Sequence, residues 1–427
     1  MVKEELLKIA TQVAYLSFLG DASENLKADG RKAPFTVREL IMSWINFDVA
    51  MLLAKQAGIS KEEITLQVLV EYSDLRGADK AIIKTFTDEV LDWKIVSIHD
   101  RNEENGLYAC TIEDSEKTAI VAFRGSEKMY ECESFIRDWM RADFALLNSR
   151  RTRQQEAAAQ YVDKLWEKGI LNKYESINIT GHSLGGNLAA HTTIAMAQEG
   201  RNKGLWEKIE GCTNFDGPGF SKVYLEEHDE NIEKASSKIT HLKWSAVGSL
   251  LYDVPGERVE FLAINEELHK DNLLDWIKYK TITRHSTKSL LFNKDGRAQR
   301  GKQDPVSKGL SLISKAVDRI MPEALTIELF AAADWIFDQI LKLKQSRDGI
   351  SIKFNEISWS EWFAQKGSIL GKCGKVIDAI IEQCKESVAN LGEAITGIFG
   401  ENYTNHNSGL KLALADGQNC DIDTVRD

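Results

Sequence analysis

The stretch Ser176-Ile177-Asn178-Ile179-Thr180-Gly181-His182-Ser183-Leu184-Gly185-Gly186, followed by a helix-favouring run over 187–198, decides the fold. The residues before Gly181 are typical of a buried strand. A G-x-S-x-G pattern between a strand and a helix places its serine on a tight turn, because side chains two residues before or after it would clash with strand or helix. The helix N-terminus then directs free N–H groups toward negative charge that develops at the serine. The pattern therefore predicts a nucleophile at Ser183.

Short β-branched runs alternate with longer helical stretches on both sides of this motif. We expect strands at Trp93–His99, Leu107–Ile112, Thr118–Phe123, Ser176–Thr180, Cys212–Phe215, Ile239–Val247 and Val259–Ile264. This alternation predicts an α/β fold with a mostly parallel central sheet covered by helices.

The chain divides by pattern into four parts. Residues 1–92 have helical periodicity and predict a helical N-terminal segment that packs on the α/β core of 93–293. A polar linker leads to 306–400, where amphipathic stripes without strand patterns predict an all-α C-terminal region. Residues 401–427 form a polar tail.

Composition excludes several classes of protein. The 427 residues carry 54 basic and 65 acidic side chains, a net charge of −11, so nucleic acid is not expected as a partner. The six cysteines lack C-x-x-C spacing, which argues against a zinc site or a disulfide scaffold, and no metal or organic cofactor is expected. The first twenty residues lack the unbroken apolar stretch of a signal peptide, and no segment is apolar enough to span a membrane. We therefore expect a cytoplasmic protein, or one exported by a route independent of a signal peptide.

Several separated motifs resemble one known family. Ala122-Phe123-Arg124-Gly125-Ser126, with Ile136-Arg137-Asp138-Trp139 and Asp143 behind it, is similar to the "FRGS/T … W … D" segment of the class 3, fungal-type lipases, which share the G-H-S-L-G-G turn. Asn214-Phe215-Asp216-Gly217-Pro218-Gly219-Phe220 looks more like a bacterial lipase-like branch. The resemblance covers about residues 65 to 290. It implies an α/β-hydrolase that cleaves a lipid ester without a cofactor, and a membrane surface is one place where such a substrate is found.

The resemblance also implies an oxyanion hole and a lid. In such lipases the residue after the R-G pair and the residue after the nucleophile supply the oxyanion donors, here Ser126 and the backbone N–H of Leu184. The segment 128–136 corresponds to the region near the lid, an amphipathic flap over an acyl-binding groove.

Two aspartates compete for the acid of a Ser–Asp–His triad in that chain order. Asp216 follows the strand after the nucleophile helix, in a turn made tight by glycines. Asp253, in Leu251-Tyr252-Asp253-Val254-Pro255, is similar to the D-x-V-P of fungal lipases, but Ser245 occupies the place where that carboxylate would leave the sheet. We favour Asp216 and keep Asp253 as the alternative.

Two histidines compete for the base. His269 follows the last expected strand and precedes Trp276, an order that resembles the bacterial branch. His285 follows a short β-like run at Lys280–Thr283 and is the alternative. His182 and His191 look like packing histidines, and His241 looks like a surface histidine.

Other functions stay open. A thioesterase or a small-ester esterase could use the same triad on the same fold, and a binding protein could keep a relic of the turn. The helices after 306 could be a cap on the hydrolase, or a module for export or a protein partner, since they loosely resemble the type VII-secreted lipase effectors of bacteria.

Overall fold

The computed structural model describes residues 3–19, 33–101, 104, 106–125, 151–265 and 284–303, with single positions between 307 and 318. Most of the expected C-terminal helices and the polar tail lie outside these residues, as does the expected lid segment 128–136. Among the described residues, no helix is long and apolar enough to cross a membrane.

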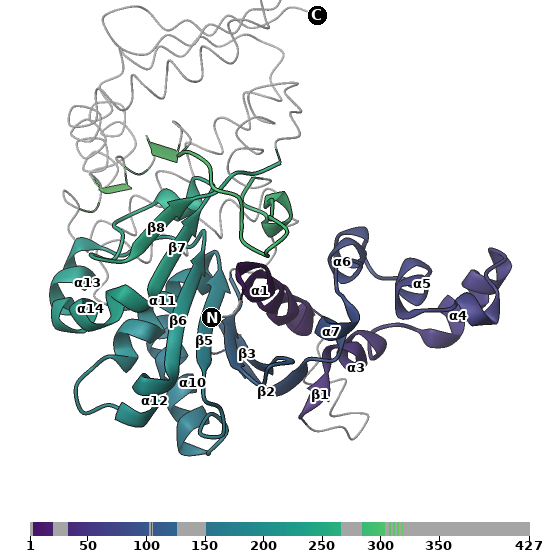
Figure 1. Ribbon diagram of the computed structural model, residues 1–427, viewed down its shortest axis with the longest axis horizontal. Helices are drawn as coiled ribbons and strands as arrows, with labels where there is room; N and C mark the ends of the chain where they lie inside the picture. The colour runs from purple at the N-terminus through teal and green to yellow at the C-terminus, as the bar shows by residue number, and fades with distance from the viewer. Residues whose placement is uncertain are drawn as a thin grey trace, which may run out of the picture.

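A sheet of eight strands, arranged in chain order, forms the centre of the molecule (Figure 1). The strands are β1 (Phe35–Thr36), β2 (Lys94–Arg101), β3 (Leu107–Glu113), β4 (Ala119–Phe123), β5 (Ile177–His182), β6 (Ile209–Phe215), β7 (Ile239–Lys243) and β8 (Arg258–Phe261). From β4 to β8 neighbouring strands run parallel, whereas β1 to β4 pair antiparallel. The sheet is thus mixed, and the expectation of a mostly parallel sheet holds only for its second half.

The change of direction follows from the length of the connections. β3 and β4 are joined by a tight turn in which the Asp114 carboxylate accepts hydrogen bonds from the backbone N–H groups of Glu116 and Thr118, at 3.0 and 2.8 Å. So short a link can only reverse the chain, because a parallel neighbour needs a crossover of a dozen or more residues. Between β5 and β6 such a crossover exists and contains the helices α11 (Leu184–Met196) and α12 (Lys203–Lys208).

Alternate residues of the strands face two separate hydrophobic layers. On β4, Ile120 and Ala122 belong to one layer, and Val121 and Phe123 to the other. The period of two is that of a sheet buried on both faces. The expected α/β class is confirmed by this sheet and by the helices on both of its faces (Figure 1).

The helices of the two layers come from different parts of the chain. The first layer contains α1 (Glu4–Leu19), α3 (Val37–Met42), α4 (Phe47–Gln56), α5 (Leu66–Glu71), α6 (Gly77–Ile83) and α7 (Asp88–Leu91). The second contains α10 (Arg153–Glu167), α11, α12, α13 (Lys222–Glu227) and α14 (Asp229–Ala235). The first 92 residues are therefore helical in their described part, apart from the two-residue strand β1.

Helix α1 lies directly on the sheet and positions one wall of the site described below. Ala10, Val13 and Ala14 are completely buried against β3 to β6. Small side chains at this spacing allow the helix to approach the strands closely. At its other end Tyr108 of β3 donates a hydrogen bond to Ser17, at 3.0 Å.

Candidate active site

Ser183 stands between β5 and α11 on a backbone conformation that few residues adopt. Its φ of 60° and ψ of −136° lie outside the regions favoured by L-residues, a strain of about 1–3 kcal/mol that persists only where the surroundings enforce it. A carbon added at Gly185 would lie 2.2 Å from the backbone oxygen of Phe123, so only glycine lets α11 begin this close to β4. The strand–turn–helix context expected for the G-x-S-x-G motif is present.

The end of β4 lies against the nucleophile. A carbon added at Gly125 would be 3.0 Å from the Cβ of Ser183 and 3.6 Å from the backbone nitrogen of Leu184. The loop after β4 and the first N–H group of α11 thus flank the serine, where an oxyanion would form. Leu184, one expected donor, is the first residue of α11, while Ser126, the other expected donor, lies outside the described residues.

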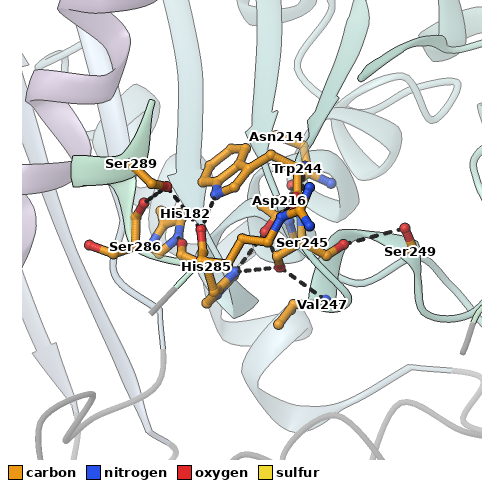
Figure 2. A network of polar contacts seen from close by, with 12 residues as sticks. His182, Asn214, Asp216, Trp244, Ser245, Val247, Ser249, His285, Ser286 and Ser289 are labelled. Atoms are coloured by element: carbon orange, nitrogen blue, oxygen red, sulfur yellow. Dashed lines mark hydrogen bonds and ion pairs between the residues drawn. The ribbon is translucent and has the colours of Figure 1, made fainter. Parts of the chain in front are cut away.

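Asp216 is fully buried at the end of β6 with four donors around its carboxylate (Figure 2). One oxygen accepts hydrogen bonds from the backbone N–H groups of Trp244 and Ser245, at 2.9 and 3.1 Å. The other accepts from the hydroxyl of Ser245 and from Nδ1 of His285, the latter at 2.7 Å. Burial alone would raise the pKa of Asp216, but the hydrogen bond and charge of His285 and the Ser245 hydroxyl lower it to about 2. Asp216 is therefore an anion at neutral pH.

His285 is held in one tautomer. The Asp216 carboxylate only accepts, so Nδ1 of His285 carries a proton, and the buried Nε2 has no hydrogen-bond partner among the described residues. The ring stacks on that of His182, with 4.5 Å between the centroids, and His182 directly precedes Ser183. An imidazole with a free Nε2 beside a strained serine can accept the serine proton.

Two neighbours fix the loop that carries His285. Trp244 donates from Nε1 to the carbonyl of Arg284, at 2.8 Å, and His182 Nε2 lies 2.9 Å from the carbonyl of His285. A carbonyl only accepts, so this nitrogen of His182 bears the proton. Burial, with the nearby His285, lowers the pKa of His182 to about 3, and it stays neutral. His182 therefore packs, as expected, and also orients the histidine loop.

The end of β7 explains the donors to Asp216. The sequence predicts a strand over Ile239–Val247, but β7 ends at Lys243. Trp244 and Ser245 have left the ladder by then, so their N–H groups point to the carboxylate instead of to a neighbouring strand. Ser245 thus donates both its N–H group and its hydroxyl to Asp216.

Of the candidate residues, the structure bonds Asp216 to His285 and stacks His285 on His182, the neighbour of Ser183, and it places Asp253 elsewhere. The Asp253 carboxylate is paired with the ammonium of Lys243, and no described residue connects it to His285. His269 lies outside the described residues, so its position relative to Asp216 stays a prediction.

The surroundings of Asp253 are the best candidate for a metal site among the described residues. His241, Asp253 and Glu257 offer ligand atoms within 4.8 Å of one another. Lys243 already supplies a positive charge to these carboxylates, and His241 Nε2 lies 2.9 Å from the carbonyl of Gly217. His241 is buried rather than exposed, which corrects the expectation of a surface histidine: its strand β7 lies inside the parallel sheet, between β6 and β8.

A pocket that is open to solvent lies beside the turn that carries Ser183. Gly125 and His182, which both flank Ser183, are part of its lining. The rest of the lining is Thr11, Gln12 and Tyr15 of α1, Ile82 of α6, Phe123 and Arg124, and Ser286, Thr287 and Lys288. The segment that follows His285 is therefore one wall, and α1 is another.

Comparisons with known proteins found one family model and several solved structures. The family model described as Mbeg1-like matches residues 87–276. Among solved structures, the chain is similar to the M37 lipase, with 13% identity, 75% of this chain and 90% of that one covered, and a TM-score of 0.34. It is also similar to lipase II from Rhizopus niveus (13% identity, 55% and 92% covered, TM-score 0.30) and to Rhizomucor miehei lipase in its propeptide complex (15%, 49% and 70%, 0.29). A search of curated proteins gave no match.

Fold and site together define a class: an α/β protein with a mixed eight-stranded sheet between two helical layers and a serine on a strained strand-to-helix turn.

Proposed function

We propose that this protein is a serine hydrolase that cleaves the carboxylic ester of a lipid through Ser183, Asp216 and His285. The observation that carries the proposal is the buried Asp216–His285 pair, whose free Nε2 is next to the strained serine turn. The choice of a lipid rests on the motifs that resemble the fungal-type lipases, and includes acylglycerols and phospholipids. Asp253 and His269, which the sequence also offered, have no part in the proposed triad.

In the proposed reaction, the Ser183 oxygen attacks the ester carbonyl while His285 Nε2 takes its proton. The negative charge that forms on the carbonyl oxygen is stabilised by the Leu184 N–H and by the loop after β4, where Ser126 is the proposed second donor. Asp216 keeps Nδ1 protonated and stabilises the imidazolium. The C–O bond to the alcohol then breaks, and the alcohol oxygen leaves with the proton from His285. Water, deprotonated by His285, attacks the acyl-serine and releases the fatty acid and free serine.

Covalent labelling tests the nucleophile and the reaction class together. A fluorophosphonate should modify Ser183, as mapped by mass spectrometry of the digested protein, and Ser183→Ala should be neither labelled nor active on a chromogenic acyl ester. Labelling at another residue, or undiminished hydrolysis by Ser183→Ala, would refute the proposal. Parallel rates on an oxoester and a thioester with the same acyl chain distinguish a lipase from a thioesterase.

A pair of substitutions identifies the histidine. His285→Gln should lower kcat about 10³-fold or more, because the serine loses its base. His269→Gln should retain activity within about threefold. The reverse ranking would assign the base to His269 and leave the serine mechanism intact.

A further inference from the structure

The pocket beside Ser183 is on the side from which the alcohol half of an ester must leave. In acyl transfer the histidine that accepts the serine proton gives it to the leaving alcohol oxygen, so the alcohol lies next to that histidine. Ser286, Thr287 and Lys288 directly follow His285 and line the pocket. His182, stacked on His285, is also part of its lining. The pocket is therefore in reach of the leaving group.

Helix α1 contributes polar side chains to the pocket, although the helix otherwise packs against the sheet. Gln12 is 5% exposed, and its Nε2 donates to the hydroxyl of Thr287 at 3.2 Å. Its Oε1 is buried and has no hydrogen-bond donor among the described residues. A buried amide oxygen without a donor costs free energy, and a ligand with a hydroxyl group can remove that cost.

Two hydroxyl groups of the pocket, on Thr11 and Thr287, also offer oxygens that can accept hydrogen bonds from a ligand. Thr11 already donates its proton to the carbonyl of Lys8, at 2.7 Å, so its oxygen is an acceptor. Thr287 accepts from Gln12, as described above. Oxygens on two walls of one pocket suit a ligand with more than one hydroxyl group better than a hydrocarbon chain, which would leave Gln12 Oε1 buried without a partner.

The cations at the pocket are already engaged. The Arg124 guanidinium lies over the ring of Phe18, 3.6 Å from its centroid. Lys288 donates to the carbonyl of Ala78, at 2.8 Å, and its pKa is lowered by burial, against the opposing charge of Asp79. Both cations thus already have a partner, so the pocket does not require an anionic ligand to neutralise them.

We propose that this pocket binds the alcohol half of the substrate and selects lipid esters whose alcohol is a neutral polyol, such as a glycerol with free hydroxyl groups. Gln12 accepts a hydrogen bond from one of these hydroxyls. The proposal rests on the proposed function, because it assigns the leaving-group side of the same site.

The test compares fatty acid release from esters with one acyl chain and different alcohols. The full-length protein should show a kcat/KM at least about tenfold higher for a 1-monoacylglycerol than for the ethyl ester. In Gln12→Met, which keeps the size of the side chain and removes the acceptor, this ratio should fall by about five- to tenfold or more. Gln160→Met, a matched change on the exposed face of α10, should leave the ratio unchanged.

Three results would overturn the polyol pocket: equal kcat/KM of the wild-type protein on both esters, a loss in Gln12→Met that is equal for both, or a preference for a lysophospholipid over the monoacylglycerol. Equal rates on both esters and a preference for the lysophospholipid are measured on the wild-type protein, so the test remains valid even if Gln12→Met does not fold. Fluorophosphonate labelling of Ser183 in the same preparation separates the two proposals. With labelling and no polyol preference only the pocket is refuted, and without labelling the hydrolase itself is.

Discussion

Asp216 carries a negative charge without contact with solvent because its backbone, its neighbours and its partner histidine all fit the charged form. Its φ of 53° is unusual for a residue with a side chain and turns the carboxylate back under the end of β7. Two backbone N–H groups, a hydroxyl and an imidazole then surround it. These donors stabilise the negative charge of Asp216 and hold its carboxylate in the position that orients His285.

Replacing this carboxylate therefore tests the triad directly. Asp216→Asn should lower kcat about 10³- to 10⁴-fold, because the amide cannot hold the Nδ1–H tautomer or stabilise the imidazolium. Asp253→Asn is the matched change at the other candidate acid and should keep kcat within about threefold. Initial rates on a saturating ester, with thermal unfolding of both variants as a control, decide between them. A larger loss in Asp253→Asn would move the acid to Asp253.

Gly248 packs so closely against Asp216 that no larger residue fits in its place. A carbon added to it would lie 2.2 Å from Oδ1 of Asp216, in the 3₁₀ turn η3 (Val247–Ser249). Gly248→Ala should displace the carboxylate, reduce kcat at least about 100-fold and lower the free energy of unfolding by about 1–3 kcal/mol.

The control for this substitution is Gly77→Ala, where an added carbon meets nothing within 4 Å and α6 begins. That variant should be within about 0.5 kcal/mol of the wild type in urea unfolding and fully active. Equal behaviour of the two alanine variants would mean that η3 does not hold Asp216.

Sequence reasoning could find the residues whose roles depend on local geometry. Ser183 lies in a motif that specifies its own turn, and the choice of Asp216 over Asp253 followed from where a strand ends. It favoured His269 over His285, whereas the structure bonds His285 to Asp216. Both histidines follow the last strand, and the long-range contacts of His285 with His182 and Trp244 are not visible in a local pattern. Gln12 was not a candidate at all, since nothing in an amphipathic helix shows that one amide faces a pocket near a residue 171 positions later.

At the scale of elements, the expected strands lie close to the observed ones. The predicted strand ends and directions are wrong where tertiary contacts, rather than the local sequence pattern, decide the structure. β7 ends four residues before the predicted end because residues 244–247 bind Asp216 and form a turn. The direction of β2 and β3 was also missed. A β-branched run has the same appearance in parallel and antiparallel strands, and only the short connections reveal the reversal.

Helix α1 is the element whose packing matters most for the proposed pocket. Leu16 is 1% exposed in the layer between α1 and the sheet, so Leu16→Ala should lower the free energy of unfolding by about 2–5 kcal/mol. Leu52 on α4 is 56% exposed, and Leu52→Ala should change the free energy of unfolding by no more than about 0.5 kcal/mol. Urea unfolding of both variants measures the difference. A small effect of Leu16→Ala would mean that α1 detaches from the sheet without cost, and the pocket would lose a wall.

At the scale of the whole molecule, buried groups that titrate gather on the two sides of the parallel half of the sheet. His182 and Asp216 lie at the ends of β5 and β6, and His191 lies inside α11, bonded through Nδ1 to the hydroxyl of Tyr224 at 2.7 Å. Burial, with the charge of His228 added, lowers the pKa of His191 well below its usual value. The folded protein thus keeps buried histidines neutral where the unfolded chain would protonate them.

This difference predicts that stability depends on pH below about 6.5, the usual pKa of an unfolded histidine. As pH falls, the unfolded chain binds a proton that neutral His191 does not, so the free energy of unfolding decreases, by up to about 1.4 kcal/mol for each pH unit and each such histidine. The contribution is complete above pH 6.5 and is lost toward acid. Urea unfolding between pH 7 and 5 should therefore give a shallower slope for His191→Gln than for the wild type, whatever offset the substitution causes at pH 7. Parallel curves would show that His191 takes up its proton without unfolding, and that the layer around α11 admits a buried charge.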